Sequence, residues 1–222
     1  MPDFVFDSSL VLYLPLYQLD GESFMSRDTY GHLVLVSGGT LWTPQGRYFD
    51  GVDDKISCGN NSVLESANNL TIVLWVKPGA QVNAYAAIIS KQDDTGDPYK
   101  GYLIDRNDTS NTQYRFVYGT GSAYRVATNF IVTTTGVWQQ IAVTKSGTTV
   151  TMFVNSVQTS TETMASATIG TNTDNLQLGD WPDSGAGRRY WVGDIGEVYV
   201  YNRALSPLEV QNNYLKTKWR YQ

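Results

Sequence analysis

The hydrophobic and polar positions of this 222-residue chain form short apolar runs separated by turn residues. Leu10–Leu14 is such a run, and Leu70–Val76 is apolar almost throughout, which predicts a central strand covered on both faces. Trp138–Thr144 and Thr149–Asn155 flank a short polar turn and predict a β-hairpin. No strand pattern alternates with a helical one. The chain is therefore expected to be all-β, a two-sheet antiparallel β-sandwich.

The end of the chain carries the one well-marked helix signal. Ile195–Tyr201 has the β-branched and aromatic residues typical of a strand. Ser206-Pro207-Leu208-Glu209 then provides a capping Ser, a Pro at the first helical position and a Glu three residues after the cap. We expect a last strand and a short helix over Pro207–Leu215, closing a single domain that spans residues 1–222.

Composition narrows the possible partners. The net charge is −5 and no basic run is present, which argues against a nucleic-acid partner. No apolar run reaches membrane-spanning length, so we expect no membrane insertion. Cys58 is the one cysteine, and we expect it to face the core of a fold that stands without disulfides.

Several motifs occur in the order known from one family. Phe49–Ile56 resembles a Phe-Asp-Gly-x-Asp-Asp-x-Val/Ile signature, and Trp138–Thr144 resembles a Trp-x-x-Val-Ala-Val-Thr strand. Val150–Val157 resembles the next segment, with Ser156 in place of the usual Gly. Many members also carry an Asp where this chain has Gly196. On these motifs the chain resembles the laminin-G-like jelly rolls of the concanavalin A-like lectin/glucanase superfamily.

The resemblance implies a jelly roll with a concave face and a rim of loops, in a module that binds glycans or mediates adhesion. Our first hypothesis is a non-catalytic, lectin-like module that binds a polysaccharide or a glycoprotein glycan in adhesion or surface attachment. It would act in an extracellular setting, at a cell surface or on a virion. The alternative is a structural component of a surface or viral assembly, whose partners are other subunits and which has no sugar site.

Catalysis is disfavoured by the residues available. Retaining glycosidases need two carboxylates about 5 Å apart, and hydrolases of this superfamily place them as Glu-x-Asp-x-x-Glu on one strand. The five glutamates of this chain show no such spacing. His32, the only histidine, lies in a polar loop far in sequence from Cys58 and is typical of a solvated residue. We expect no enzymatic activity.

Calcium is the one cofactor that the sequence suggests. Ca²⁺ prefers six to eight oxygen ligands on loops. The resemblance places the first and last strands side by side, so their loops can bring together Asp20, Asp28, Asp50, Asp53 and Asp194. Alternatively, Asp50 and Asp53 only accept nearby backbone N–H groups and hold their turn. Asp93–Asp97 is a second acidic loop, more typical of a solvated turn.

Candidate sugar contacts are aromatic and planar polar side chains on loops. One group lies in the Asp180–Trp191 loop, where Trp181 before Pro182 is expected to be an exposed anchor. A second group surrounds the Gly119–Ser122 turn. Trp75 is assigned to the core. The expected ligand contacts are Trp181, Arg188, Arg189, Tyr190, Tyr118 and Tyr124.

Overall fold

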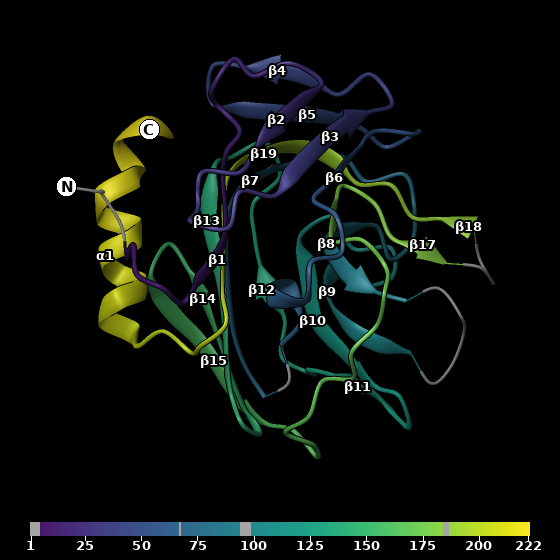
Figure 1. Ribbon diagram of the computed structural model, residues 1–222, viewed down its shortest axis with the longest axis vertical. Coiled ribbons are helices and arrows are strands. Elements are labelled where there is room, and N and C mark those ends of the chain that lie inside the picture. The colour runs from purple at the N-terminus through teal and green to yellow at the C-terminus, as the bar shows by residue number, and fades with distance from the viewer. Residues whose placement is uncertain (1–4, 67, 94–98, 184–186) are drawn as a thin grey trace.

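The computed structural model describes residues 5–66, 68–93, 99–183 and 187–222, with the backbone alone for 182, 183, 187 and 188. Two antiparallel sheets face each other as a jelly-roll sandwich (Figure 1). The fold class expected from the sequence is therefore confirmed.

The first sheet runs in the order β15 (Val157–Thr163), β14 (Thr149–Val154), β13 (Gln139–Ser146), β7 (Asn69–Pro78), β19 (Val192–Tyr201), β5 (Gly46–Asp50) and β4 (Leu41–Thr43), with β1 (Leu10–Pro15) also beside β19. The second sheet runs β11 (Tyr124–Val126), β10 (Gln113–Thr120), β9 (Lys100–Arg106), β8 (Ala87–Gln92), β16 (Gln177–Leu178), β6 (Lys55–Ser57), β3 (Leu33–Ser37) and β2 (Ser23–Met25), with β12 (Ile131–Val132) beside β10. The remaining elements are the hairpin β17 (Pro182–Asp183) with β18 (Gly187–Arg188), the 3-10 turns η1 (Ser62–Leu64) and η2 (Lys218–Arg220), and the helix α1 (Pro207–Thr217).

The core lies between the two sheets, and β7 shows how the sequence specifies it. Alternate residues of a strand point to opposite faces, so Ile72 and Leu74 enter the core while Val73 and Trp75 face outward. The outward residues are also buried, because the C-terminal segment covers that face. Coverage on both faces explains the nearly continuous apolar run and confirms the prediction of a central strand.

Helix α1 closes the outer face of the first sheet, on the left in Figure 1. Ser206 Oγ accepts the N–H of Glu209 at 3.3 Å, and Glu209 Oε2 accepts the N–H of Ser206 at 2.8 Å. The predicted capping box is thus confirmed, and the helix runs two residues beyond the predicted end. Val210 packs with Val73 and Tyr199 in an apolar cluster beneath the helix.

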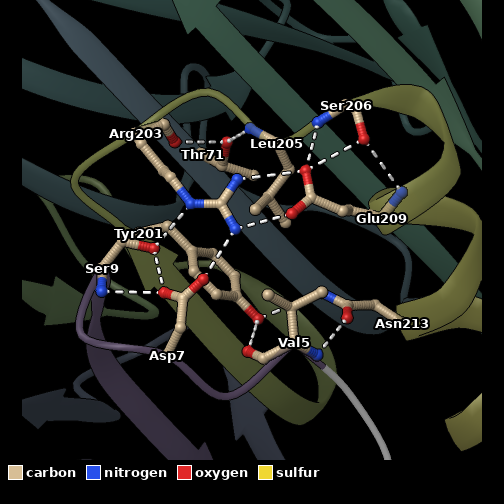
Figure 2. A network of polar contacts seen from close by, with 10 residues as sticks. All are labelled: Val5, Asp7, Ser9, Thr71, Tyr201, Arg203, Leu205, Ser206, Glu209 and Asn213. Atoms are coloured by element: carbon tan, nitrogen blue, oxygen red, sulfur yellow. Dashed lines mark hydrogen bonds and ion pairs between the residues drawn. The ribbon is translucent and has the colours of Figure 1, made fainter.

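A polar network ties the first described residues to this face and to the helix α1 (Figure 2). Arg203 donates to the Asp7 carboxylate at 2.8 Å and to the Glu209 carboxylate at 2.6 Å. The N–H of Val5 donates to Asn213 Oδ1 at 2.9 Å. The first described residues, the end of β19 and α1 are therefore held as one structural unit.

The connection between β14 and β15 is a tight turn in the left-handed region. Asn155 has φ 49° and Ser156 has φ 66°. Glycine adopts this conformation without steric cost, whereas a side chain is strained there, and Asn tolerates it better than most residues. Ser156, at the position where the resembled family usually has Gly, therefore adopts the left-handed conformation at a steric cost.

Two sequence expectations about single residues have different outcomes. Cys58 is buried in the core, as expected, and burial raises the pKa of its thiol. The solvated position expected for His32 is wrong. Its ring is buried, with Nε2 2.7 Å from the carbonyl oxygen of Val11, because the loop between β2 and β3 folds back against β1.

Candidate functional site

The outer face of the second sheet carries a small apolar floor. In β8, β9 and β10 the core side chains alternate with Ala87, Leu103 and Val117, which point away from the sandwich. Trp181 packs on these three residues. Unlike the first sheet, this face is not covered by any helix of the described residues (Figure 1).

The backbone after β16 places Trp181 on that floor. Gly179 has φ +77°, and a Cβ there would lie 2.3 Å from the Phe49 ring, so only glycine fits this bend. The N–H of Gly179 donates to the carbonyl of Ile88, and the N–H of Trp191 donates to the carbonyl of Gly179, both at 2.9 Å. These bonds hold the two ends of the segment, Gly179 and Trp191, together and beside β8.

Trp181 forms one wall of an open hollow of about 250 Å³. We call it the outer-face hollow. The described residues that line it come from distant parts of the chain: Tyr85, Tyr99, Arg115, Tyr124, Trp181 and Arg189. The ring of Tyr99 meets the rings of Trp181 and Tyr124 edge-on, with centroids 5.6 Å apart in both pairs.

Two guanidinium groups lie over the rings of the hollow. That of Arg189 is 4.6 Å from the Trp181 centroid and 5.0 Å from the Tyr85 centroid. That of Arg115 is 4.7 Å from the Tyr85 centroid. These are cation–π distances, and the polar edges of the guanidinium groups supply hydrogen-bond donors beside apolar rings.

A buried carboxylate fixes one of the two arginines. Asp105, fully buried on β9, accepts two hydrogen bonds from Arg115, of which the Nε–Oδ1 bond measures 3.0 Å. Burial raises the pKa of Asp105 to about 6, despite the opposing effect of the Arg115 hydrogen bonds and charge. Arg115 is thus held in one orientation by a partner that titrates just below neutral pH.

Three of the predicted ligand residues meet in this hollow: Trp181, Arg189 and Tyr124. They were assigned from two separate groups of the sequence, which the fold brings together. The expected exposure of Trp181 is wrong, since the side chain is only 2% exposed. The apolar floor lies beneath it and the guanidinium of Arg189 lies over its ring.

Two of the other predicted ligand residues, Tyr118 and Tyr190, are not among the described residues that line the hollow. Tyr118 is wrong as a ligand contact, because it faces the core and donates its hydroxyl to the carbonyl of Ser166. Tyr190 is half-buried, and its carbonyl accepts a hydrogen bond from Asn83. Arg188 belongs to β18, and its side chain lies outside the described atoms.

Sequence reasoning missed Arg115 and Asp105. The period-two pattern of β10 contained the signal, because Tyr114, Phe116 and Tyr118 point into the core. Arg115 must then point outward, as does the cross-strand partner Asp105. An Arg opposite an Asp on the outer face of a strand pair marks a polar site. A search for aromatic residues on loops does not reveal it.

A second cluster of candidate ligands lies in the turn after β5. Carboxylate oxygens of Asp50, Asp53 and Asp54 lie within 4.8 Å of one another. Asp50 accepts the N–H of Val52 at 2.8 Å, so the turn-holding role considered for it is observed. The third carboxylate, Asp54, is 3% exposed, and its Oδ2 accepts the N–H of Asp50. Its Oδ1 has no hydrogen-bond partner in the described part of the chain. Burial raises the pKa of Asp54.

The expected convergence of Asp20, Asp28 and Asp194 on this turn is wrong, because each is held by a partner elsewhere. Asp20 pairs with Arg27 at 3.0 Å, and Asp194 lies 3.8 Å from the Lys77 ammonium on β7. Asp28 is buried and accepts backbone N–H groups, among them that of Tyr13. Of the acidic loop Asp93–Asp97, residues 94–97 lie outside the described ranges.

Within the described ranges, no helix combines the length and apolar character needed to cross a membrane.

Comparison with known proteins gives a family and a set of structural neighbours. Residues 49–211 match the family model Laminin_G_3, described as the concanavalin A-like lectin/glucanases superfamily. A search of curated proteins finds no match.

Among solved structures, the receptor-binding domain of botulinum neurotoxin C/D mosaic serotype is similar with a TM-score of 0.72 at 13% identity, covering 94% of this chain and 51% of that one. Trypanosoma rangeli sialidase in complex with sialic acid gives a TM-score of 0.68 at 15% identity, covering 96% of this chain and 34% of that one. The binding domain of Paraclostridial Mosquitocidal Protein 1 gives a TM-score of 0.69 at 13% identity, covering 95% of this chain and 52% of that one. The chain thus spans about half of the toxin domains and a third of the sialidase, and at these identities the likeness concerns the fold alone.

Proposed function

The chain belongs to the concanavalin A-like lectin/glucanases superfamily, and on that premise we propose that it is a non-catalytic glycan-binding module whose site is the outer-face hollow. The observation that carries the proposal is the hollow itself, where aromatic and guanidinium groups from distant segments meet on a sheet face that no described helix covers. The partner would be a polysaccharide or a glycoprotein glycan outside the cell.

The hollow suits a sugar in size and in chemistry. Its volume of about 250 Å³ lies slightly below the range of drug-sized pockets, which fits one or two sugar rings. Tyr99 and Tyr124 offer ring surface and hydroxyls, while the arginines offer planar donors. Because the Arg189 guanidinium lies over Trp181, a sugar that stacks on the indole would first displace it.

The acidic residues support a non-catalytic role. Four of the five glutamates are held in contacts that join separate elements: Glu65 with Lys91, Glu162 with Thr128, Glu197 with Arg220 and Glu209 with Arg203. At the hollow, the Asp105 carboxylate is engaged by Arg115. A retaining or inverting glycosidase would need two carboxyl groups placed for acid and nucleophile or base.

Two of the structural neighbours support recognition, since they are named as the receptor-binding domain of a botulinum neurotoxin and the binding domain of a mosquitocidal protein. A third neighbour is a sialidase, an enzyme, solved with sialic acid. The proposal extends this class of role, binding at a surface, to the present chain.

A glycan array tests the proposal directly. Wild-type protein should give sugar hits that Tyr124→Ala loses, because this half-buried ring forms one wall of the hollow. Tyr30→Ala is the matched control, since Tyr30 is exposed and lies outside the hollow, and it should keep the hits. Hits that survive Tyr124→Ala would place the site elsewhere. An array without hits, with a closed oligomer in solution, would favour a structural subunit instead.

We also propose that the turn of Asp50, Asp53 and Asp54 binds calcium. Three carboxylates within reach of one ion, one of them with a buried unpaired oxygen, match the hard oxygen ligands that Ca²⁺ prefers. Binding at a hundred times the dissociation constant would add about 2.7 kcal/mol to the unfolding free energy.

Thermal unfolding in chelator and in millimolar calcium measures that increment. Asp53→Asn should remove it with little change in chelator, because the Asp53 side chain makes no hydrogen bond with the described residues. Identical melting temperatures of wild-type protein in chelator and in calcium would exclude the metal.

A further inference from the structure

Arg47 places a charge on the core side of β5. Alternate residues of a strand share a face, and Phe49, two residues further on, packs in the core between the sheets. Arg47 therefore also points inward, and it is only 6% exposed. It lies at the end of the sandwich that carries β2, β3, β4 and β5, at the top of Figure 1. A guanidinium thus occupies a core-facing position near the edge of both sheets.

The chain itself supplies little compensation for this charge. Nη2 of Arg47 donates to the carbonyl of Asp20, whereas the carboxylate of Asp20 pairs with Arg27 at 3.0 Å. Nε and Nη1 of Arg47 make no hydrogen bond with the described residues, and none of these residues forms an ion pair with it. Burial lowers the pKa of Arg47, despite the opposing effect of the Asp20 charge. Because a buried charge without an ionic partner is costly, an anionic ligand would remove that cost.

A hollow of about 300 Å³ opens beside Arg47, and we call it the edge hollow. The described residues that line it are Arg47, Glu22, Val36 and the loop Ser37–Thr40. Gly38 of that loop has φ +87°, and a Cβ there would lie 2.3 Å from the carbonyl oxygen of Asp53. The loop is therefore packed directly on the backbone of the turn after β5, and only glycine fits at this contact. This wall of the edge hollow is held in place by the fold.

The edge hollow offers two opposite charges that do not meet. Arg47 supplies N–H donors, and Glu22 supplies an exposed carboxylate that forms no hydrogen bond or ion pair with the described residues. Both line the hollow, yet they form no ion pair with each other. The hydroxyl groups of Ser37 and Thr40 add donors and acceptors to the same lining. A few polar groups of this kind fix the orientation of a small ligand, which here needs an acceptor at one end and a donor at the other.

We propose that the edge hollow binds a small carboxylic acid that carries an amino or hydroxyl group at its other end. The ligand carboxylate accepts hydrogen bonds from Arg47, and the amino or hydroxyl group faces Glu22. Charge-assisted hydrogen bonds of this kind are about twice as strong as neutral ones. The volume of about 300 Å³ is at the lower end of the range of ligand pockets, which suits a small molecule. The edge hollow shares no lining residue with the outer-face hollow, so this inference is independent of the proposed glycan binding.

Three probes with the same three-carbon chain test the two ends of the site: β-alanine, propionate and propylammonium. An NMR titration of amide shifts in Ser37–Thr40 and β5 measures each dissociation constant. We expect β-alanine to bind about tenfold more tightly than propionate, and propylammonium, which lacks the carboxylate, not to bind. 3-Hydroxypropionate separates an amino from a hydroxyl ligand, and tighter binding of either acid than of propionate supports the proposal. Equal binding of all three acids, or no binding of any, would overturn it.

Three variants assign the binding to residues. Arg47→Leu should abolish β-alanine binding without lowering the urea midpoint, because replacing buried charge by an apolar side chain is often neutral or stabilising. Lys216→Gln, an exposed position on α1, changes the net charge equally and should bind as wild-type protein does. Glu22→Gln should reduce the preference for β-alanine over propionate. Unchanged binding by Arg47→Leu would overturn the site. If Arg47→Leu fails to fold, the Glu22→Gln preference decides, and a preference equal to that of wild-type protein would overturn the proposal.

Discussion

Each of the two sheets carries a buried tryptophan on its outer face, but the surroundings of the two indoles differ. On the first sheet, Trp75 stacks on Tyr221 at 4.2 Å, and its Nε1 donates to Thr217 Oγ1 at 2.9 Å. On the second sheet, Trp181 contacts tyrosine edges and a guanidinium, and its Nε1 has no hydrogen-bond partner in the described part of the chain. The N–H of the first indole is hydrogen-bonded within the chain, and that of the second finds no partner among the described residues.

The difference indicates which face stabilises the fold and which face is accessible to a ligand. The C-terminal helix covers the first face and supplies the hydrogen-bond partner of the Trp75 indole. The buried side-chain amide of Gln140, opposite Trp75 on β13, has no hydrogen-bond partner among the described residues. The second face keeps two arginines beside aromatic rings in an open hollow. Similar residue types therefore stabilise the fold on one side and form a candidate binding site on the other.

The largest expected effect is a loss of unfolding free energy when the covered face of the first sheet is disrupted. Trp75→Ala should lower the unfolding free energy by about 3–5 kcal/mol, because it removes a fully packed indole beneath the C-terminal segment. Urea denaturation measures the change. Trp219→Ala is the matched control, since that indole is 64% exposed, and its cost should stay within about 0.5 kcal/mol. Similar losses in both variants would show that the helix does not seal this face.

On the other face, a tyrosine should matter for binding more than for stability. Tyr124→Ala should weaken binding of any glycan found on the array by about 1.5–3 kcal/mol, the range for burying a large apolar side chain. Its effect on unfolding should be smaller, because the ring is only half-buried. Titration and urea denaturation of the same preparation compare the two losses. A larger loss in stability than in binding would assign Tyr124 to the core.

The helix cap offers a smaller effect on the structural face. Ser206→Ala removes the side chain that accepts the Glu209 N–H and should cost about 1 kcal/mol in unfolding free energy. Glycan binding should not change, because the cap belongs to the covered face. An unchanged denaturation midpoint would mean that the capping box does not contribute to stability.

The smallest effect concerns acid stability of the same face. Hydrogen bonds from Arg203 lower the pKa of Glu209 from 4.5 to about 2. A carboxylate with a lowered folded-state pKa stabilises the protein above its unfolded pKa, and this contribution is lost progressively as the pH falls from about 4.5 to about 2. Glu209→Gln should therefore lose less stability than wild-type protein between pH 5 and pH 3. Urea midpoints at these pH values that fall equally in both proteins would contradict the role of the network in Figure 2.

Much of the fold was predictable because its signals are local. The apolar run of β7 and the capping box of α1 are properties of neighbouring residues, and both match the structure closely. Tyr118 was placed wrongly because a residue beside a glycine-rich turn was judged by its neighbourhood, although the alternation with Tyr114 and Phe116 points it inward. Trp181 lines the hollow, but its burial depends on a floor formed by three other strands and could not be read from its neighbours in sequence.

The acidic residues show where sequence reasoning fails for a physical reason. Asp50 and Asp53 were paired because they share a turn, and they do lie together. Asp20, Asp28 and Asp194 were added from the expected neighbourhood of the strands, but each is bound by a nearby cation or backbone N–H group. Local partners decide the position of a carboxylate, and a sequence does not show them.

The most direct test of the account is an NMR titration of isotope-labelled protein with a glycan from the array. Amide shifts report where the ligand lies without any mutation. The account predicts changes in β8, β9, β10 and β11 and in residues 179–191, with none in α1 or β14. Changes confined to the helix-covered face of the first sheet, with the hollow unaffected, would contradict it.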